Sequence, residues 1–161
     1  MIKLIRFIET MDREDVPLKD ISKADVYESG DWLVPVGNGT SEPKTSAWME
    51  ATEANDANAL SDNDIRMARL VWFEKGRPDA KYIGKYTTIR GDATRIKTDC
   101  FDEKQTYEPG MLLTIKAAAS GSRKEGKFVL APAGSNDVVK AVCFEDFKVD
   151  PDELLTFELV Q

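Results

Sequence analysis

The segment spanning residues 107–145 constrains the fold more than any other part of the chain. In it, short apolar runs alternate with breaks that contain Gly, Pro or Asn. This punctuation is typical of antiparallel strands joined by tight turns. Strands are predicted at residues 111–116, 127–130, 137–144 and 154–160, and turns at residues 107–110, 120–126, 132–136 and 148–152. The spacing indicates a small antiparallel β-barrel or sandwich.

The preceding region, from residue 26, extends the same pattern. Strands are expected in DWLVPVGNG, in two runs that form a hairpin around residues 75–79, and in the alternating TRIKTDCF. Residues 47–51 favour a strand followed by a polar loop to Asp64, although the spacing of Ala47, Ala51 and Ala54 also permits a short helix. No long helix is predicted. The fold class is therefore all-β, with residues 26–161 as one barrel or sandwich domain.

Residues 1–25 differ in character and are predicted to be an N-terminal extended arm and linker. The apolar positions of the arm are Ile2, Leu4, Ile5, Phe7 and Ile8. Their β-branched content favours a strand, while a helical face through Met11 fits as well. DREDVPLKD, broken by Pro17, is interpreted as a linker. The arm either adds a strand to another chain or returns to its own sheet.

Charge and residue usage exclude several function classes. The formal net charge is −7, which disfavours a general nucleic-acid binder because phosphate affinity needs a concentrated positive surface. The chain has no histidine, so Ser–His, Cys–His and His–metal catalysis are excluded. No motif singles out a carboxylate pair, and we expect no enzyme, cofactor or metal. No apolar stretch reaches membrane-spanning length and no signal peptide is recognised, so we expect no membrane partner and synthesis in a cytoplasm.

The cysteines and tryptophans are expected to have packing roles. Cys100 and Cys143 lie in or beside apolar runs without metal-ligand spacing, which favours buried free thiols. A disulfide would require neighbouring strands. The tryptophans at positions 32, 48 and 72 occur in strand-like runs. They favour core or interface packing over a stacking platform for sugars or bases.

Residues 121–128, GSRKEGKF, match the spacing of a phosphate-binding loop. Phe128 occupies the position at which such a loop needs Ser or Thr for magnesium. The sequence that follows, KFVLAP, is predicted to be a strand and not the required helix. We interpret this segment as a hairpin connection.

Three other short motifs have simpler explanations. Residues 90–92 (RGD) fall at a predicted turn, where Gly and Asp are favoured for geometry alone. Residues 38–40 (NGT) match a glycosylation site only in form, since no secretory signal accompanies them. The acidic run at residues 55–64 lacks the EF-hand pattern, so a solvated loop is expected.

The order of these turns and strands resembles a known family. Tyr107-x-Pro109-Gly110, then residues 112–114 (LLT), Gly126-Lys127 and LAPAGSNDVVKAV are similar to the C-terminal half of head decoration proteins of tailed bacteriophages. GDWLVPVGNG and GKYTTIRGDATRIKTDCFD resemble the upstream part, so the likeness covers residues 30–161. Lys140 departs from it, because it stands where the family pattern has a glycine.

The resemblance implies a non-enzymatic virion protein that binds the outer surface of a capsid lattice and bridges major capsid protein subunits. It also implies a homodimer or homotrimer, assembled in the host cytoplasm and located on the capsid. The candidate capsid contact is the arm, through the five apolar positions named above. The alternatives are a tail-tube or tail-terminator protein, or a carbohydrate-binding β-module.

Overall fold

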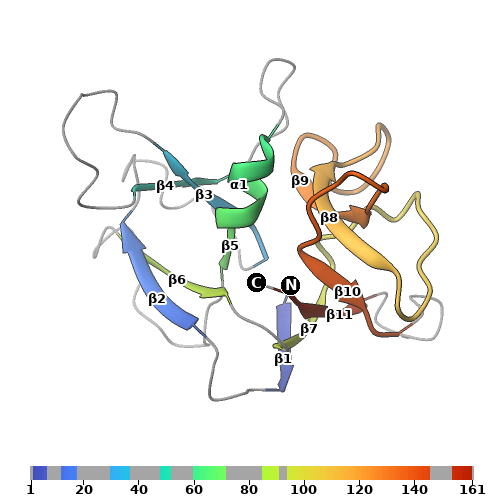
Figure 1. The fold of residues 1–161 in the computed structure, drawn as a ribbon, viewed down its shortest axis with the longest axis horizontal. Helices are drawn as coiled ribbons and strands as arrows, with labels where there is room; N and C mark the ends of the chain where they lie inside the picture. The colour runs from blue at the N-terminus through green and yellow to red at the C-terminus, as the bar shows by residue number, and fades with distance from the viewer. Residues whose placement is uncertain are drawn as a thin grey trace.

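The computed structural model describes eight stretches of the chain: residues 2–6, 12–17, 30–36, 48–51, 60–71, 85–90, 94–145 and 154–160. Within them, eleven strands and one short helix follow one another along the sequence. All strand pairings are antiparallel, and the strands form two sheets (Figure 1). The all-β prediction is confirmed, and the described strands do not close into a barrel.

The larger sheet contains six strands in the order β1-β7-β11-β10-β8-β9. Their bounds are β1 Ile2–Arg6, β7 Arg95–Thr98, β8 Leu112–Ala117, β9 Phe128–Pro132, β10 Ala141–Cys143 and β11 Leu155–Leu159. Apart from β1, the sheet is built from the C-terminal half of the chain. The segment with regular turns, residues 107–145, therefore supplies three of its six strands, β8, β9 and β10.

The second sheet contains five strands in the order β2-β6-β5-β3-β4. Their bounds are β2 Asp12–Pro17, β3 Trp32–Val36, β4 Trp48–Ala51, β5 Arg69–Val71 and β6 Lys85–Arg90. The helix α1, Asp62–Met67, comes immediately before β5 and contacts β3. Because β1 belongs to one sheet and β2 to the other, the N-terminal part of the chain contributes an edge strand to each.

Helix α1 begins at a capping box. The Ser61 hydroxyl accepts a hydrogen bond from the backbone N–H of Asp64 at 3.2 Å, and the Asp64 carboxylate accepts one from the backbone N–H of Ser61 at 2.9 Å. These bonds satisfy two N–H groups that a helix start leaves without partners. Ile65 is the buried residue of the helix. Local capping thus produces a helix where we predicted loop and strand.

A single hydrophobic core joins the two sheets. It contains Trp32, Val34 and Leu70 from the five-stranded sheet and Ile65 from α1. From the six-stranded sheet and its turns it takes Ile96, Phe101, Tyr107, Leu113, Ile115, Leu130, Ala141, Leu155, Phe157 and Leu159. The described parts of the two sheets are therefore packed against each other.

One edge of the six-stranded sheet, at β9, is sealed by the chain itself. Phe101, just after β7, forms a parallel bridge with Leu130 of β9. The Leu130 N–H donates to the Cys100 carbonyl at 3.2 Å, and the Asp102 N–H donates to the Leu130 carbonyl at 3.0 Å. The sheet thus curls back toward β7 without forming a continuous ring of described strands.

The predicted strands of the C-terminal half are found close to their expected positions. The strand TRIKTDCF alternates as expected, since Ile96 and Thr98 are buried while Arg95 and Lys97 are partly exposed. β5 and β6 pair as the predicted hairpin, although residues 72–84 between them lie outside the described part. The turn predicted at residues 148–152 also lies wholly outside it.

The N-terminal expectation needs correction in one respect. Residues 12–17, expected within a linker, form β2 and pair with β6 over their whole length. Residues 2–6 pair with β7, which is the alternative in which the arm returns to its own sheet. The physical reason is pairing: β6 offers a strand edge whose backbone bonds outweigh the poor strand propensity of DREDVP.

Candidate functional site

The edge strand β1 contains the described part of the predicted contact arm. Ile2 is paired with Thr98 and Leu4 with Ile96, so both share register positions with buried residues of β7. Ile5 falls at a register shift between Leu4 and Arg6, where β1 has one residue more than β7. Phe7 and Ile8 lie outside the described residues. Among the described strands, β1 is paired on one side only.

Basic residues occupy the other register positions of β1 and β7. Lys3 lies directly opposite Lys97, and Arg6 lies directly opposite Arg95. Residues directly opposite one another in an antiparallel pair share a face of the sheet, and like charges in that arrangement are destabilising. Two such pairs at one edge are therefore a local conflict in the sequence.

The β7 side of this face is partly neutralised by the chain's own carboxylates. Arg95 Nη2 lies 3.2 Å from Glu158 Oε2 on β11, and its guanidinium is 3.4 Å from the centre of the Phe144 ring. Lys97 Nζ lies 3.9 Å from Glu145 Oε2. Phe144 itself is 41% exposed. Among the described side chains, this face thus carries two cations, two carboxylates and an exposed aromatic ring.

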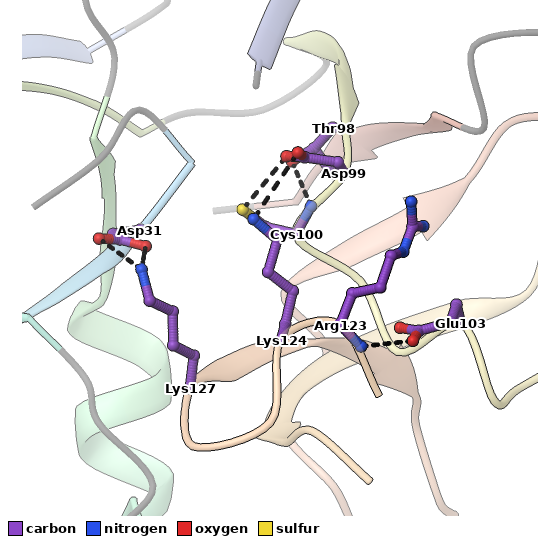
Figure 2. A network of polar contacts seen from close by, with 8 residues as sticks. All are labelled: Asp31, Thr98, Asp99, Cys100, Glu103, Arg123, Lys124 and Lys127. Atoms are coloured by element: carbon purple, nitrogen blue, oxygen red, sulfur yellow. Dashed lines mark hydrogen bonds and ion pairs between the residues drawn. The ribbon is translucent and has the colours of Figure 1, made fainter. Parts of the chain in front are cut away.

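A second polar region lies where the β8–β9 connection meets the five-stranded sheet (Figure 2). Lys127 Nζ contacts Asp31 Oδ1 at 3.0 Å, just before β3, and Lys124 Nζ lies 3.6 Å from Asp99 Oδ2. The backbone N–H of Arg123 donates to the Glu103 carboxylate. Three acidic residues, one just before β3 and two in the segment after β7, therefore hold this connection in place.

This connection is the segment whose sequence matches phosphate-loop spacing. It joins the antiparallel strands β8 and β9, as predicted, and Phe128 is the first residue of a strand. Gly121 and Gly126 both adopt positive φ, which suits turns. The Gly121 N–H donates to the Glu125 carboxylate at 2.8 Å. The loop is fastened by its own carboxylate and has no helix behind it to complete a phosphate cradle.

Behind this loop, Gly30 and Cys100 are in close contact. Gly30 has φ +108°, and a Cβ placed on it would lie 2.7 Å from the Cys100 sulfur. Only glycine fits there, because both the backbone conformation and the space exclude a side chain. Burial raises the pKa of the Cys100 thiol to about 11. The thiol is thus neutral near pH 7, and its role is packing.

Neither cysteine forms a disulfide, and both are buried, as predicted. The Cys143 thiol donates to the Glu145 carbonyl at 3.2 Å. Of the tryptophans, Trp32 is 1% exposed and belongs to the core, in agreement with its predicted packing role. The side chains of Trp48 and Trp72 lie outside the described part.

Lys140, the departure from the family pattern, is almost fully buried. Its ammonium group donates to the backbone carbonyl of Arg66 at 3.2 Å, in the last turn of α1. A carbonyl in the last turn of a helix has no partner within the helix, and the helix dipole favours a cation there. Lys140 therefore connects the strand β10 region to α1. The local pattern around Lys140, a lysine inside an apolar run, does not predict this contact.

The remaining sequence motifs do not form a site in the described residues. Residues 38–40 and 91–92 lie outside the described part, as does the first half of the acidic run, residues 55–59. The described end of that run supplies the Asp64 cap of α1. No cluster of His, Cys, Asp or Glu able to hold a metal ion occurs among the described residues. Of the helices described, none is long and apolar enough to cross a membrane.

Comparison with known proteins gives no relative for this chain. No family model, no curated protein and no solved structure matches it.

Proposed function

We propose that this protein is a non-enzymatic structural component of a phage virion that binds the outer surface of the capsid lattice and bridges major capsid protein subunits. The observation that carries the proposal is the position of β1. It is an apolar, β-branched strand at the edge of a sheet and, among the described strands, is paired on one side only.

An edge strand presents backbone N–H and C=O groups that can extend a partner's sheet. The rest of the described molecule is suited to support such an edge, because both sheets share one core and the β8–β9 connection is fastened at three points. A capsid is proposed as the partner because the turn and strand order of residues 107–145 resembles that of head decoration proteins. In this form the protein acts as a homodimer or homotrimer.

The test uses undecorated heads assembled from the major capsid protein of the phage or prophage whose genome encodes this chain. Purified protein is added, the heads are pelleted, and bound protein is measured and located by electron microscopy. We expect saturable binding at regular lattice positions. Protein that stays in the supernatant, or that alone assembles into open tubes as a tail protein would, contradicts the proposal.

The role of β1 is tested separately by amide hydrogen exchange. Deleting the N-terminal strands would remove one edge from each sheet and confuse binding with folding. In the intact protein, binding through β1 is expected to slow exchange in a peptide covering residues 1–9, while a peptide covering β8 serves as the control. Unchanged exchange in residues 2–6 on saturated heads would show that another surface makes the contact.

A further inference from the structure

The face of the six-stranded sheet that points away from the hydrophobic core gathers exposed apolar side chains. Leu112 of β8 lies directly opposite Val142 of β10, so these two side chains share a face, while their neighbours Leu113 and Ala141 belong to the core. Phe144 follows Val142 by two residues and therefore lies on the same face as Val142. Leu112 is 50% exposed and Phe144 is 41% exposed. Two of the three large apolar side chains that are exposed in the described part thus lie together.

The charged side chains on this face occur as pairs of opposite sign. The register row continues from β10 to Glu158 on β11 and to Arg95 on β7, and these two residues form an ion pair. The Arg95 guanidinium also covers one side of the Phe144 ring. Lys97 lies beside Glu145 in the same way. The four charges of these two pairs sum to zero, although the formal net charge of the chain is −7.

We propose that a second copy of the chain docks on this face across a two-fold axis. The face, called the Phe144 face below, comprises Leu112, Val142, Phe144, Arg95 and Glu158. In a two-fold contact, residue i of one copy meets residue j of the other, and j meets i in return. The apolar end of the row therefore meets the end that carries the ring, so Leu112 packs on Phe144 of the partner subunit, and this contact occurs twice.

The balance of charge is the reason for choosing a second copy as the occupant. A chain with a net charge of −7 repels its own copies over most of its surface, so self-association needs a patch on which the charges cancel. On the Phe144 face each cation lies beside a carboxylate of its own chain, and docking leaves no charge buried without a partner. A strongly acidic or basic partner gains no electrostatic attraction from such a face.

This inference deepens the proposed function, because it gives the homo-oligomer a surface and makes it a dimer. It rests on the proposed function only for the expectation that the protein associates with itself. The position of the surface follows from the exposed side chains, the strand register and the two ion pairs.

The experiment measures the mass of the intact protein by sedimentation velocity over a wide range of concentrations. We expect a reversible equilibrium between monomer and dimer. Leu112→Glu places a carboxylate against the ring, and Phe144→Lys places an ammonium against the leucine. Each is expected to raise the dimer dissociation constant by at least about tenfold, because a charge is then buried without a partner. Met67→Glu, at an equally exposed apolar position on α1, is the control and should leave the constant unchanged.

Mixing the two variants tests whether the two positions meet. A mixed dimer of Leu112→Glu with Phe144→Lys contains one unaltered contact and one contact in which the introduced carboxylate faces the introduced ammonium. We expect the mixture to form dimers at concentrations at which each variant alone is monomeric. Recovery of this kind requires both variants to be folded, which circular dichroism will check for each.

Five results would overturn the inference. They are a monomer at every concentration, a trimer as the smallest assembly, a dimer that neither variant weakens, an equal loss of dimer in Met67→Glu, and a mixture that does not recover. Variants that keep the dimer mass but lose binding to heads would show that the Phe144 face docks on the capsid instead. The mass is measured without capsids, so a dimer that fails to bind heads contradicts only the proposed function. A trimer that binds heads contradicts only the two-fold contact.

Discussion

The two edges of the six-stranded sheet differ in whether other described parts of the chain cover them. At β9 the chain covers its own edge, with backbone bonds from Cys100 and Asp102 to Leu130. At β1 no described strand covers the outer side, and like-charged residues occupy the rows next to it. The sealed edge shows that closing an edge needs only a few residues. The strand addition proposed at β1 depends on this difference between the two edges.

Tyr107 joins several parts of the sealed β9 edge through hydrogen bonds and a ring contact. Its hydroxyl donates to the carbonyls of Asp102 at 2.9 Å and Leu130 at 3.2 Å, and its ring meets Phe101 edge-on with centroids 5.5 Å apart. Burial raises the pKa of this phenol, which stays protonated as a donor. One residue thus fastens the turn before β8 to both the bridge and β9.

The largest predicted effect follows from removing this residue. Tyr107→Ala is expected to lower the free energy of unfolding by about 3–5 kcal/mol, and Tyr107→Phe by about 1–2 kcal/mol, measured by urea denaturation. Leu112→Ala, at a half-exposed position of the same sheet, is the control and should cost much less. A Tyr107→Ala cost as small as the control's would mean that the β9 edge is not sealed by this contact.

The second prediction concerns the close approach behind the seal. Gly30→Ala is expected to cost about 2–4 kcal/mol, since it combines backbone strain with a collision at the Cys100 sulfur. Gly121→Ala is a matched control, because Gly121 also has positive φ but open space around its Cβ position. The difference between the two costs isolates the collision.

A double variant, Gly30→Ala with Cys100→Ala, tests the collision with the Cys100 sulfur directly. Removing the sulfur should recover part of the loss, with a coupling energy of about 1 kcal/mol or more in a double-mutant cycle. Additive effects would show that a side chain at position 30 does not collide with Cys100.

A smaller effect of opposite sign is expected at the open edge. Lys3→Gln removes one member of a like-charged pair and should raise the free energy of unfolding by about 0.2–1 kcal/mol at low salt. The gain should shrink as salt is added, because exposed charges are screened. Lys104→Gln is the control for net charge. If Lys3→Gln lowered the free energy of unfolding, Lys3 and Lys97 would not repel each other, and the two edges would not differ in this respect.

The smallest effect is a titration near the sealed half of the sheet. Lys116 Nζ lies 2.7 Å from Asp137 Oδ2, and this contact together with the Gly134 N–H holds the pKa of Asp137 below its ordinary value of 3.8. Its stabilising contribution is therefore complete above the unfolded pKa and is lost as the pH falls through the folded pKa. In NMR titrations, Lys116→Met should raise the Asp137 pKa, and an unchanged value would contradict the contact.

Local signals in the sequence account for part of this structure. Alternation in TRIKTDCF and the turn residues of 107–145 predicted β7 through β9 and the buried thiols, because each depends on residues close in sequence. The helix α1 had a findable signal as well, since Ser61 and Asp64 have capping-box spacing. The apolar run that follows favours a strand, and no helix was predicted at residues 62–67.

The remaining features depend on contacts that are distant in sequence. The charged segment DREDVP has poor strand propensity, and it forms β2 only because β6 lies beside it. The like-charged rows at the β1 edge require the register of β1 against β7, for which no local pattern exists. The buried ammonium of Lys140 likewise depends on where α1 ends.

The pairing of β1 with β7 also sets an order of events during synthesis. Residues 2–6 find their partner only after Arg95–Thr98 have left the ribosome, and at ordinary translation rates this delay is roughly 5–20 seconds. During that interval an apolar strand is available to chaperones and to other nascent chains. Its two basic residues, Lys3 and Arg6, disfavour association of the waiting strand with copies of itself.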